Sequence, residues 1–375
     1  MSWADPSRYL ERILVEASCL SDEYCQDILR RAALPWQIVT DDGANAAQWQ
    51  ADASSWRAAK KTLMLHRYQG RFFKPCPGTR EYRCCGYQVL TTGFNCPMDC
   101  VYCILQAYLN RPWTSVFINI SDLCDELALA LTDGQPRRIG SGEFTDSLAL
   151  DRITGLSQIL VPFFARRDNA VLELKTKSAV VENLEGLDHN GHTIVAWSLN
   201  SPEIMRRQEA RSASLDERLE AARRCAAWGY RLAFHFDPLI LHNNWRQGYR
   251  QTITALFAAV PPEAIAWISL GALRFLPPLK QIAVARFPQT EIYRHEFIDG
   301  LDGKRRYFRP RRVELYQFVY QELRRFADPA TCIYFCMESD EIWREVMGFS
   351  PEEKGGLAAM LDRAAFPNLL FHSHT

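Results

Sequence analysis

The sequence predicts an α/β protein built around a parallel sheet with crossover helices. Two observations predict this fold class. From residue 86 onward, short apolar stretches alternate with longer helical ones, and each of six predicted strands ends in a polar cluster. The 375 residues are 47% hydrophobic and 23% charged, which is ordinary globular composition and excludes a mainly disordered chain. A sheet of this kind curves into a full or partial barrel.

Residues 1–85 are predicted to form a small N-terminal α/β unit with a linker. Strands are expected at 12–16, 36–39 and 61–66, and a helix is expected to open at Ser21-Asp-Glu23, which offers a cap and an acidic first turn. The stretch 72–85 contains Pro75, Pro77 and Gly78 and is expected to be an irregular connection. No ligand spacing repeats among its thiols, so they are interpreted as buried or incidental: Cys76, Cys84 and Cys85.

Residues 86–290 are predicted to form the barrel. Its six strands are expected at 87–92, 138–142, 170–176, 193–199, 232–238 and 266–274. Helices are expected at 123–131, 148–164, 215–228 and 245–258. Ser214 is placed to cap the third of these helices, with Glu217 completing a capping box. Because working residues gather at the carboxyl ends of barrel strands, the polar clusters there are expected to line one site.

Residues 291–375 are predicted to form a C-terminal hairpin and helical extension. Segments 291–297 and 306–308 flank Gly300-Leu-Asp-Gly303, which is typical of a β-hairpin turn, and a helix at 314–325 and a strand at 332–335 follow. The hairpin is basic with interleaved aromatic residues, and this pattern indicates either a nucleic-acid surface or a merely solvated hairpin. The candidate nucleic-acid-binding residues are Lys304, Arg305, Arg306 and Arg309.

Net charge and targeting signals indicate the partners and the cellular location to expect for this protein. The formal net charge is zero, so any nucleic-acid affinity must come from a local patch. The first residues lack a basic patch followed by an apolar region, and no apolar run of about 18 residues occurs. We therefore expect a soluble cytoplasmic protein with no membrane partner, in which thiols stay reduced and clustered cysteines indicate metal binding or catalysis.

Three of the 12 cysteines fall within eight residues, at the spacing Cys96-x-x-x-Cys100-x-x-Cys103. Three thiolates on a short loop can hold three corners of a cubane iron-sulfur cluster and leave one iron open for another ligand. The main rival is a structural zinc site, which needs four ligands. His66, His235 or a distant cysteine would supply the fourth, so spacing leaves both metals open.

This triplet, placed after a predicted strand, resembles the hallmark of the radical S-adenosylmethionine superfamily, whose fold is a partial (β/α)6 barrel. Further stretches resemble the spore photoproduct lyase-like family over nearly the whole chain. They are Thr91-Thr-Gly-Phe-Asn-Cys-Pro, Leu105-Gln106, Thr176-Lys177, Ser198-Leu-Asn200, Gly229-Tyr230, Pro238-Leu-Ile240, Trp245 and Gly248-Tyr249.

The resemblance implies a radical enzyme. A reduced 4Fe-4S cluster on Cys96, Cys100 and Cys103 would cleave S-adenosylmethionine to a 5′-deoxyadenosyl radical. The implied cofactor-binding residues are Gly142, Glu143, Lys177, Ser198 and Asn200, and the implied catalytic residues are Tyr102 and Glu143. An anion and a cation at adjacent strand ends suit a zwitterionic amino acid head group. The implied partners are DNA carrying a thymine lesion and a reducing donor such as flavodoxin or ferredoxin.

The sequence departs from this family at two positions. The lyases carry a hydrogen-donating cysteine just after the second barrel strand, where this chain has Phe144, and a tyrosine after the third cluster cysteine, where it has Ile104. Cys336 and Cys225 are other thiols in the chain. Three hypotheses follow: lesion repair with a modified quenching step, a radical enzyme acting on another nucleoside or peptide, and a zinc-stabilised nucleic-acid-binding module.

Overall fold

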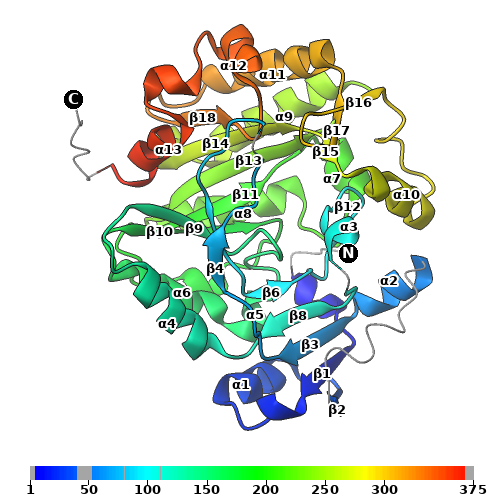
Figure 1. Cartoon of the computed structure of the whole chain (residues 1–375), viewed down its shortest axis with the longest axis vertical. Helices are drawn as coiled ribbons and strands as arrows, with labels where there is room; N and C mark the ends of the chain where they lie inside the picture. The colour runs from blue at the N-terminus through cyan, green and yellow to red at the C-terminus, as the bar shows by residue number, and fades with distance from the viewer. Residues whose placement is uncertain (1–4, 40–52, 80, 110, 368–375) are drawn as a thin grey trace.

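Eight strands form the central sheet, in the order β18-β14-β13-β11-β10-β9-β5-β4, in a computed structural model that describes residues 5–39, 53–79, 81–109 and 111–367 (Figure 1). All neighbours are parallel except β4 and β5. The strands are β4 (Phe73–Pro75), β5 (Gln88–Leu90), β9 (Arg137–Gly140), β10 (Ala170–Thr176), β11 (Thr193–Ser198), β13 (Arg231–Leu239), β14 (Ile265–Ala272) and β18 (Cys332–Phe335).

All six predicted barrel strands lie in this sheet, so the predicted parallel α/β fold is confirmed. The strand predicted at 332–335 is also confirmed and adds at one edge, beside β14. The prediction of an irregular connection at 72–85 was wrong at its start. Phe73–Pro75 is strand β4, because its backbone pairs antiparallel with β5, with Phe73 opposite Leu90.

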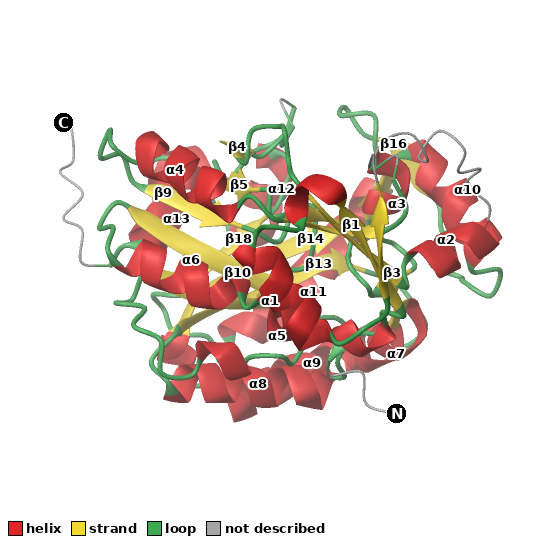
Figure 2. Cartoon of the chain, turned by 90° about the horizontal axis from the view of Figure 1, so that it is seen from below, coloured by secondary structure: helices red, strands yellow, loops and turns green. Residues whose placement is uncertain are grey.

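Crossover helices cover the sheet (Figure 2). They are α4 (Ile120–Ala130), α5 (Asp151–Thr154), α6 (Leu156–Ala165), α7 (Pro202–Gln208), α8 (Leu215–Ala227) and α9 (Trp245–Ala259). The predicted capping box of α8 is present, with Ser214 and Glu217 bonding each other's backbone. The prediction of a single helix at 148–164 was wrong. Two helices, α5 and α6, occupy most of this stretch, because Gly155 adopts a left-handed φ of 61° between them.

A second, five-stranded sheet contains the predicted N-terminal strands. Its order is β2-β1-β3-β8-β6, with β1 (Arg12–Glu16), β2 (Trp36–Val39), β3 (Thr62–His66), β6 (Gly93–Phe94) and β8 (Thr114–Phe117), and α1 (Glu23–Ala32) packs against it. Strands β6 and β8 come from beyond residue 85. Between them in the chain lie residues 95–104, which carry Cys96, Cys100 and Cys103 and are called the cysteine loop below. The segment between the two strands therefore starts and ends in this sheet, beside the barrel (Figure 1). The division of the chain at residues 85 and 290 stays a prediction.

The predicted hairpin is present. Strands β16 (Phe297–Asp299) and β17 (Arg305–Tyr307) pair antiparallel, and β15 (Arg274–Phe275) joins them as a third strand. The remaining helices are α2 (Ala53–Ala59), α3 (Leu105–Tyr108), α10 (Pro277–Arg286), α11 (Arg309–Arg324), α12 (Asp340–Met347) and α13 (Leu357–Ala365). Within the described ranges, none of the helices has the length and apolar character needed to span a lipid bilayer.

Candidate active site

A pocket of about 280 Å³ lies where the cysteine loop meets the carboxyl ends of the central strands. Nine of the predicted site residues line it: Cys96, Cys100, Tyr102, Cys103, Gly142, Glu143, Lys177, Ser198 and Lys304. They come from segments more than 200 residues apart, and the parallel sheet brings them together because its strands end at one edge. Asn200, Arg305, Arg306 and Arg309 lie outside the residues that line this pocket.

The cysteine loop is held by backbone pairing and by one side chain. Strand β7 (Asp99–Cys100) pairs antiparallel with β12 (Glu209–Ala210). The Gln106 amide donates to the carbonyls of Cys100, Val101 and Cys103 at 3.2, 3.2 and 3.3 Å. These contacts fix the turn that carries the second and third cysteines.

The three thiols form a donor set that suits a cluster with an open corner. Burial raises the pKa of Cys96 to about 12 and that of Cys100 well above its usual value. Metal binding must therefore displace protons from them. In the described part of the chain, no three His, Cys, Asp or Glu side chains converge as a ready-made metal site.

His235, one candidate for a fourth zinc ligand, is already bonded through both ring nitrogens. They lie 2.7 Å from Ser269 Oγ and 2.7 Å from Glu173 Oε1. His66 is a residue of β3 in the other sheet and does not line the pocket. Neither histidine is therefore placed to complete a four-ligand zinc site with the three cysteines.

Glu143 and Lys177 place opposite charges in the pocket. The Glu143 carboxylate lies 4.0 Å from Lys175 Nζ. Lys177 Nζ lies 5.8 Å from the centre of the Tyr102 ring and forms no ion pair within the described residues. At Gly142 an added Cβ would come within 2.9 Å of Lys175 Cβ, so only glycine fits beside this pair. This arrangement can hold the ammonium and carboxylate of an amino acid head group.

Asp146 positions Lys177 and was not among the predicted site residues. Its carboxylate accepts hydrogen bonds from Thr176 Oγ1 at 2.6 Å and from the Lys177 backbone N–H at 2.8 Å. It also accepts from the N–H groups of Leu148 and Ala149. Asp146 thus ties the loop after β9 to the end of β10. Its place in the polar cluster directly after the second predicted strand was the signal available in the sequence.

Asp237 and Arg274 were also missed as site residues, and both line the pocket. Their side chains form a two-pronged ion pair at 3.0 and 2.9 Å, and Arg274 Nη2 lies 3.3 Å from Cys336 Sγ. Burial alone would raise the pKa of Asp237, but the charge and hydrogen bonds of Arg274, together with the charges of Lys175 and His235, lower that pKa. Both residues end a predicted strand, which marks them in the sequence, although no motif quoted for the family includes them.

Tyr102 faces the pocket with its hydroxyl bonded away from solvent. The hydroxyl donates to Glu209, which pairs with Arg218 at 2.6 Å in the fully buried interior. Burial, followed by the Glu209 charge, raises the pKa of Tyr102 well above its usual value. The phenol is therefore neutral and fixed. Its catalytic role stays a prediction.

The remaining predicted residues occupy structural or surface positions. Asn200 is buried, and its amide donates to Pro238 O at 2.7 Å while its carbonyl accepts from Tyr249 Oη at 2.8 Å. Arg306 is 2% exposed and pairs with Asp302 at 2.8 Å, so it supports the hairpin from inside. Arg305 and Arg309 are 41% and 48% exposed and pair with Asp299 and Glu345.

Phe144 and Ile104 are the apolar residues at the two positions where the sequence differs from the family pattern. Phe144 is buried with Val89 and Leu105, and Tyr108 stacks on it at 5.9 Å between ring centres. Ile104 lines the pocket and is 37% exposed. Cys225 is buried on α8 and does not line the pocket, whereas Cys336 precedes Met337, which does.

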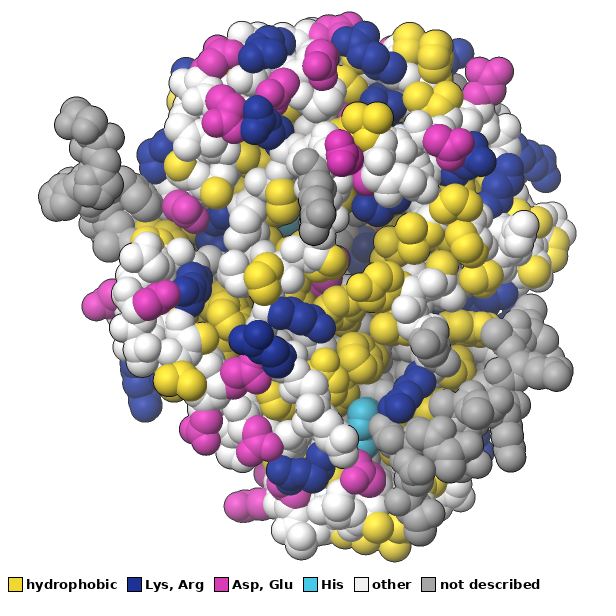
Figure 3. Space-filling model, in the orientation of Figure 1, with side chains coloured by type: hydrophobic (Ala, Val, Ile, Leu, Met, Phe, Trp, Pro, Cys, Tyr) yellow, Lys and Arg dark blue, Asp and Glu magenta, His cyan; other side chains and the backbone are white. Residues whose placement is uncertain are grey.

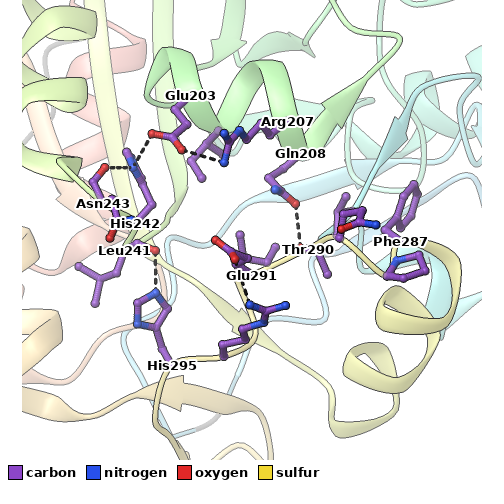
Figure 4. Close-up of a pocket in the computed structure, with 16 residues that line it drawn as sticks. Glu203, Arg207, Gln208, Leu241, His242, Asn243, Phe287, Thr290, Glu291 and His295 are labelled. Atoms are coloured by element: carbon purple, nitrogen blue, oxygen red, sulfur yellow. Dashed lines mark hydrogen bonds and ion pairs between the residues drawn. The ribbon is translucent and has the colours of Figure 1, made fainter.

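A second hollow of about 800 Å³ lies between α7 and the segment after α10 (Figure 4). Its charged side chains bond one another: Glu203 pairs with Arg207 at 3.3 Å, and Glu291 pairs with Arg294 at 2.9 Å. Val101 is the member of the cysteine loop that lines it. None of the predicted site residues does, so the chemistry expected from the sequence belongs to the smaller pocket.

Comparison with known proteins identifies the family of this chain. The sequence model of the family described as spore photoproduct lyase matches residues 15–329. The spore photoproduct lyase of Bacillus subtilis is 26% identical over 272 residues, covering 71% of this chain and 76% of the relative. That of a Geobacillus species is 27% identical over 278 residues, covering 73% and 78%.

Solved structures of spore photoproduct lyase share the fold. A cysteine-to-alanine variant superposes with a TM-score of 0.77 at 22% identity, covering 87% of this chain and 98% of its own. A double variant with bound S-adenosylmethionine and a dinucleoside spore photoproduct also has a TM-score of 0.77, at coverages of 88% and 99%. These structures confirm the predicted partial barrel. Because the family model covers most of the sequence, this chain belongs to the spore photoproduct lyase family.

Proposed function

We propose that this protein is a radical S-adenosylmethionine enzyme that reverses a thymine photoproduct in DNA. One observation carries the proposal. In a chain of this family, three cysteine thiols, a carboxylate and an unpaired ammonium among the described residues line one pocket at the carboxyl edge of the sheet. The bound S-adenosylmethionine and dinucleoside photoproduct of a relative's structure support the same cofactor and substrate class here.

Cys96, Cys100 and Cys103 would hold a 4Fe-4S cluster, and Glu143 and Lys177 would bind the amino and carboxylate groups of S-adenosylmethionine. Once bound, and with the cluster reduced by a donor such as flavodoxin or ferredoxin, the cluster and S-adenosylmethionine would supply the radical chemistry that removes a hydrogen atom from the substrate. The chain's own part is to orient the reactants and exclude water. Met98, Leu273 and Met337 give the pocket apolar walls for this purpose.

The hairpin would contact the DNA around a lesion turned out of the helix. Lys304 reaches the pocket wall and pairs with Asp302 at 2.9 Å, and Arg305 lies on the exposed side. On the face in Figure 3, Lys and Arg side chains alternate with Asp and Glu rather than forming one basic field. Binding would therefore depend on the hairpin and not on a global charge.

A second candidate function is radical chemistry on a different nucleoside or peptide. The observation that favours it is Phe144, a buried phenyl ring where the resemblance expects a hydrogen-donating thiol. Cofactor cleavage would be the same in both functions. Only the substrate and the final hydrogen transfer would differ.

The test is turnover with a dinucleoside spore photoproduct under strictly anaerobic conditions. The reconstituted, reduced protein should regenerate the two thymines and form 5′-deoxyadenosine. Cys100→Ala should lose both products, whereas Cys225→Ala, which removes a buried thiol away from the pocket, should keep them. Formation of 5′-deoxyadenosine without any thymine would reject the lesion and favour the second candidate.

A further inference from the structure

A group of buried charges surrounds the base of the cysteine loop, outside the residues proposed to bind S-adenosylmethionine. Asp99, the residue before Cys100, is flanked by Lys60, Arg211 and Arg286; these four residues are called the Asp99 cluster below. Arg286 Nη2 lies 2.7 Å from the carboxylate, Arg211 Nη2 3.8 Å and Lys60 Nζ 3.9 Å. The four side chains are between 2% and 7% exposed, so the charges act in a low-dielectric interior.

The Asp99 cluster carries more positive than negative charge. Within the described residues, Asp99 is the one carboxylate that pairs with these three cations. Arg286 Nε is also buried without a hydrogen-bond partner in the described structure. Buried charge without compensation is costly. The excess therefore points to an anionic group that belongs beside the loop, and a cluster ligated by three thiolates is such a group.

Two of the cations donate hydrogen bonds directly to the backbone of the loop, and the third contacts a side chain that does so. Lys60 Nζ donates to Cys96 O at 3.2 Å and to Met98 O. Arg211 Nη1 donates to Pro97 O at 3.3 Å. Arg286 donates to the side-chain oxygen Oε1 of Gln106, and the Nε2 amide of the same side chain donates to three backbone carbonyls of the loop. The positive charges are thereby fixed against the segment that carries the thiols.

Arg211 adopts a backbone conformation that non-glycine residues rarely take. Its φ is +65°, in the left-handed region, which costs on the order of 1 kcal/mol for a residue with a Cβ. Such strain persists where the surrounding structure demands it and concentrates at functional sites. Here it accompanies a side chain that contacts both Pro97 and Asp99.

We infer that the Asp99 cluster positions the cysteine loop and raises the reduction potential of the iron-sulfur cluster bound there. This inference rests on the proposed function, because it requires that the loop holds such a cluster. Net charge, burial and neighbouring hydrogen bonds set the potential of these centres. Fixed cations stabilise the added electron and so raise the potential. The negative charge of Asp99 reduces this rise, while its ion pairs hold the cations in place.

The test uses charge changes of opposite sign. Lys60→Gln removes a positive charge and should lower the midpoint potential of the reconstituted protein, whereas Asp99→Asn removes a negative charge and should raise it. Arg286→Lys keeps the charge and should leave the potential near that of the wild type. The potential is measured by anaerobic redox titration followed by electron paramagnetic resonance. A purely structural role would not move the two variants in opposite directions.

Asp362→Asn is the matched control. Asp362 forms an ion pair with the buried Arg138, with 2.7 Å between Oδ1 and Nε, and neither residue belongs to the cysteine loop. The potential of this variant should equal that of the wild type. Should Lys60→Gln fail to fold, Arg211→Gln also removes a positive charge and should also lower the potential. Arg211 lines an open hollow of about 890 Å³, so its replacement should be tolerated better.

Two results overturn the inference in different ways. Unchanged potentials, or shifts of the same sign in the Asp99 and Lys60 variants, reject it while leaving the proposed function intact, provided that the wild type assembles four irons. A wild-type protein that takes up zinc and assembles no iron-sulfur cluster rejects the inference together with the proposed function.

Discussion

At the scale of single residues, the parallel sheet explains why short polar stretches of sequence predict one site. Glu143, Lys177 and Ser198 lie at or near the carboxyl ends of the neighbouring strands β9, β10 and β11 and line one pocket. Asn200 lies only two residues beyond Ser198, but its side chain bonds Pro238 and Tyr249 instead of lining the pocket. The sequence indicates which strand end a residue follows. It does not reveal which neighbours take up the hydrogen bonds of its side chain.

Lys177→Met should weaken S-adenosylmethionine binding about 10- to 100-fold, because a charged hydrogen bond contributes about 1.5–3 kcal/mol. Iron content should not change, since Lys177 is not a proposed ligand. The measurement is equilibrium dialysis with the reconstituted protein. Lys74→Met is the control, because Lys74 lies over the Phe144 ring and does not line the pocket. Equal affinity in the wild type and Lys177→Met would contradict the assignment of Lys177.

Phe144→Cys should raise the ratio of thymine regenerated to 5′-deoxyadenosine formed, because it restores a thiol S–H at the position where the resemblance expects one. The substitution replaces a buried ring and should cost about 2–4 kcal/mol of stability. Phe164→Cys, at a buried ring of α6 outside the pocket, is the control for that cost. A ratio that stays the same or falls in Phe144→Cys would show that this position does not limit hydrogen return.

At the scale of elements, apolar periodicity was a good predictor of strands and a poorer one of breaks. Six barrel strands and the capping box of α8 are confirmed. The break at Gly155 was missed because the apolar pattern continues through it, and only the left-handed φ separates α5 from α6. Strand β4 was missed because it is short and contains Pro75, and its partner β5 lies beyond an intervening turn-rich stretch.

The exposed arginine of the hairpin should matter for DNA binding. Arg305→Ala should weaken binding and reduce the salt slope by about 0.9, as expected for one lost phosphate contact. S-adenosylmethionine cleavage should not change. Arg223→Ala on α8 is the matched control, because Arg223 is exposed and paired with Glu220 as Arg305 is with Asp299. The measurement is a fluorescence anisotropy titration at several salt concentrations. An Arg305 variant with an unaltered slope would remove the hairpin from the interface.

The hairpin should also lose stability in acid. Burial alone would raise the pKa of Asp302, but hydrogen bonds from Arg306 and Lys304 outweigh it and lower that pKa from 3.8 to about 2. Because the folded-state pKa is depressed, the stabilisation is present above about pH 4 and is lost as pH falls toward 2. It amounts to about 2 kcal/mol.

Denaturant unfolding of the wild type and Asp302→Asn at pH 6, 4 and about 2.5 tests this pH dependence. The difference in free energy of unfolding between the two proteins should shrink as pH falls. A difference that is constant over this range would mean that Asp302 does not titrate as the ion pairs require.

At the scale of the whole molecule, the features that the sequence could not predict are those that join distant segments. The ion pairs of Asp99 connect α10 and the residue after α2 to the cysteine loop, and the sequence shows no spacing that links Lys60, Asp99 and Arg286. The local triplet, by contrast, was visible because three cysteines lie within eight residues. Long-range electrostatics around the cysteine loop are set by the fold and become apparent only in three dimensions.

The central claim is that the cysteine loop and the strand ends form one radical S-adenosylmethionine site. The most direct measurement is the formation of 5′-deoxyadenosine from S-adenosylmethionine by the anaerobically reconstituted, reduced protein, with metal content determined on the same sample. We predict about four irons per chain, 5′-deoxyadenosine from the wild type and none from Cys100→Ala. Stoichiometric zinc in the loop with no 5′-deoxyadenosine from the wild type would contradict the claim.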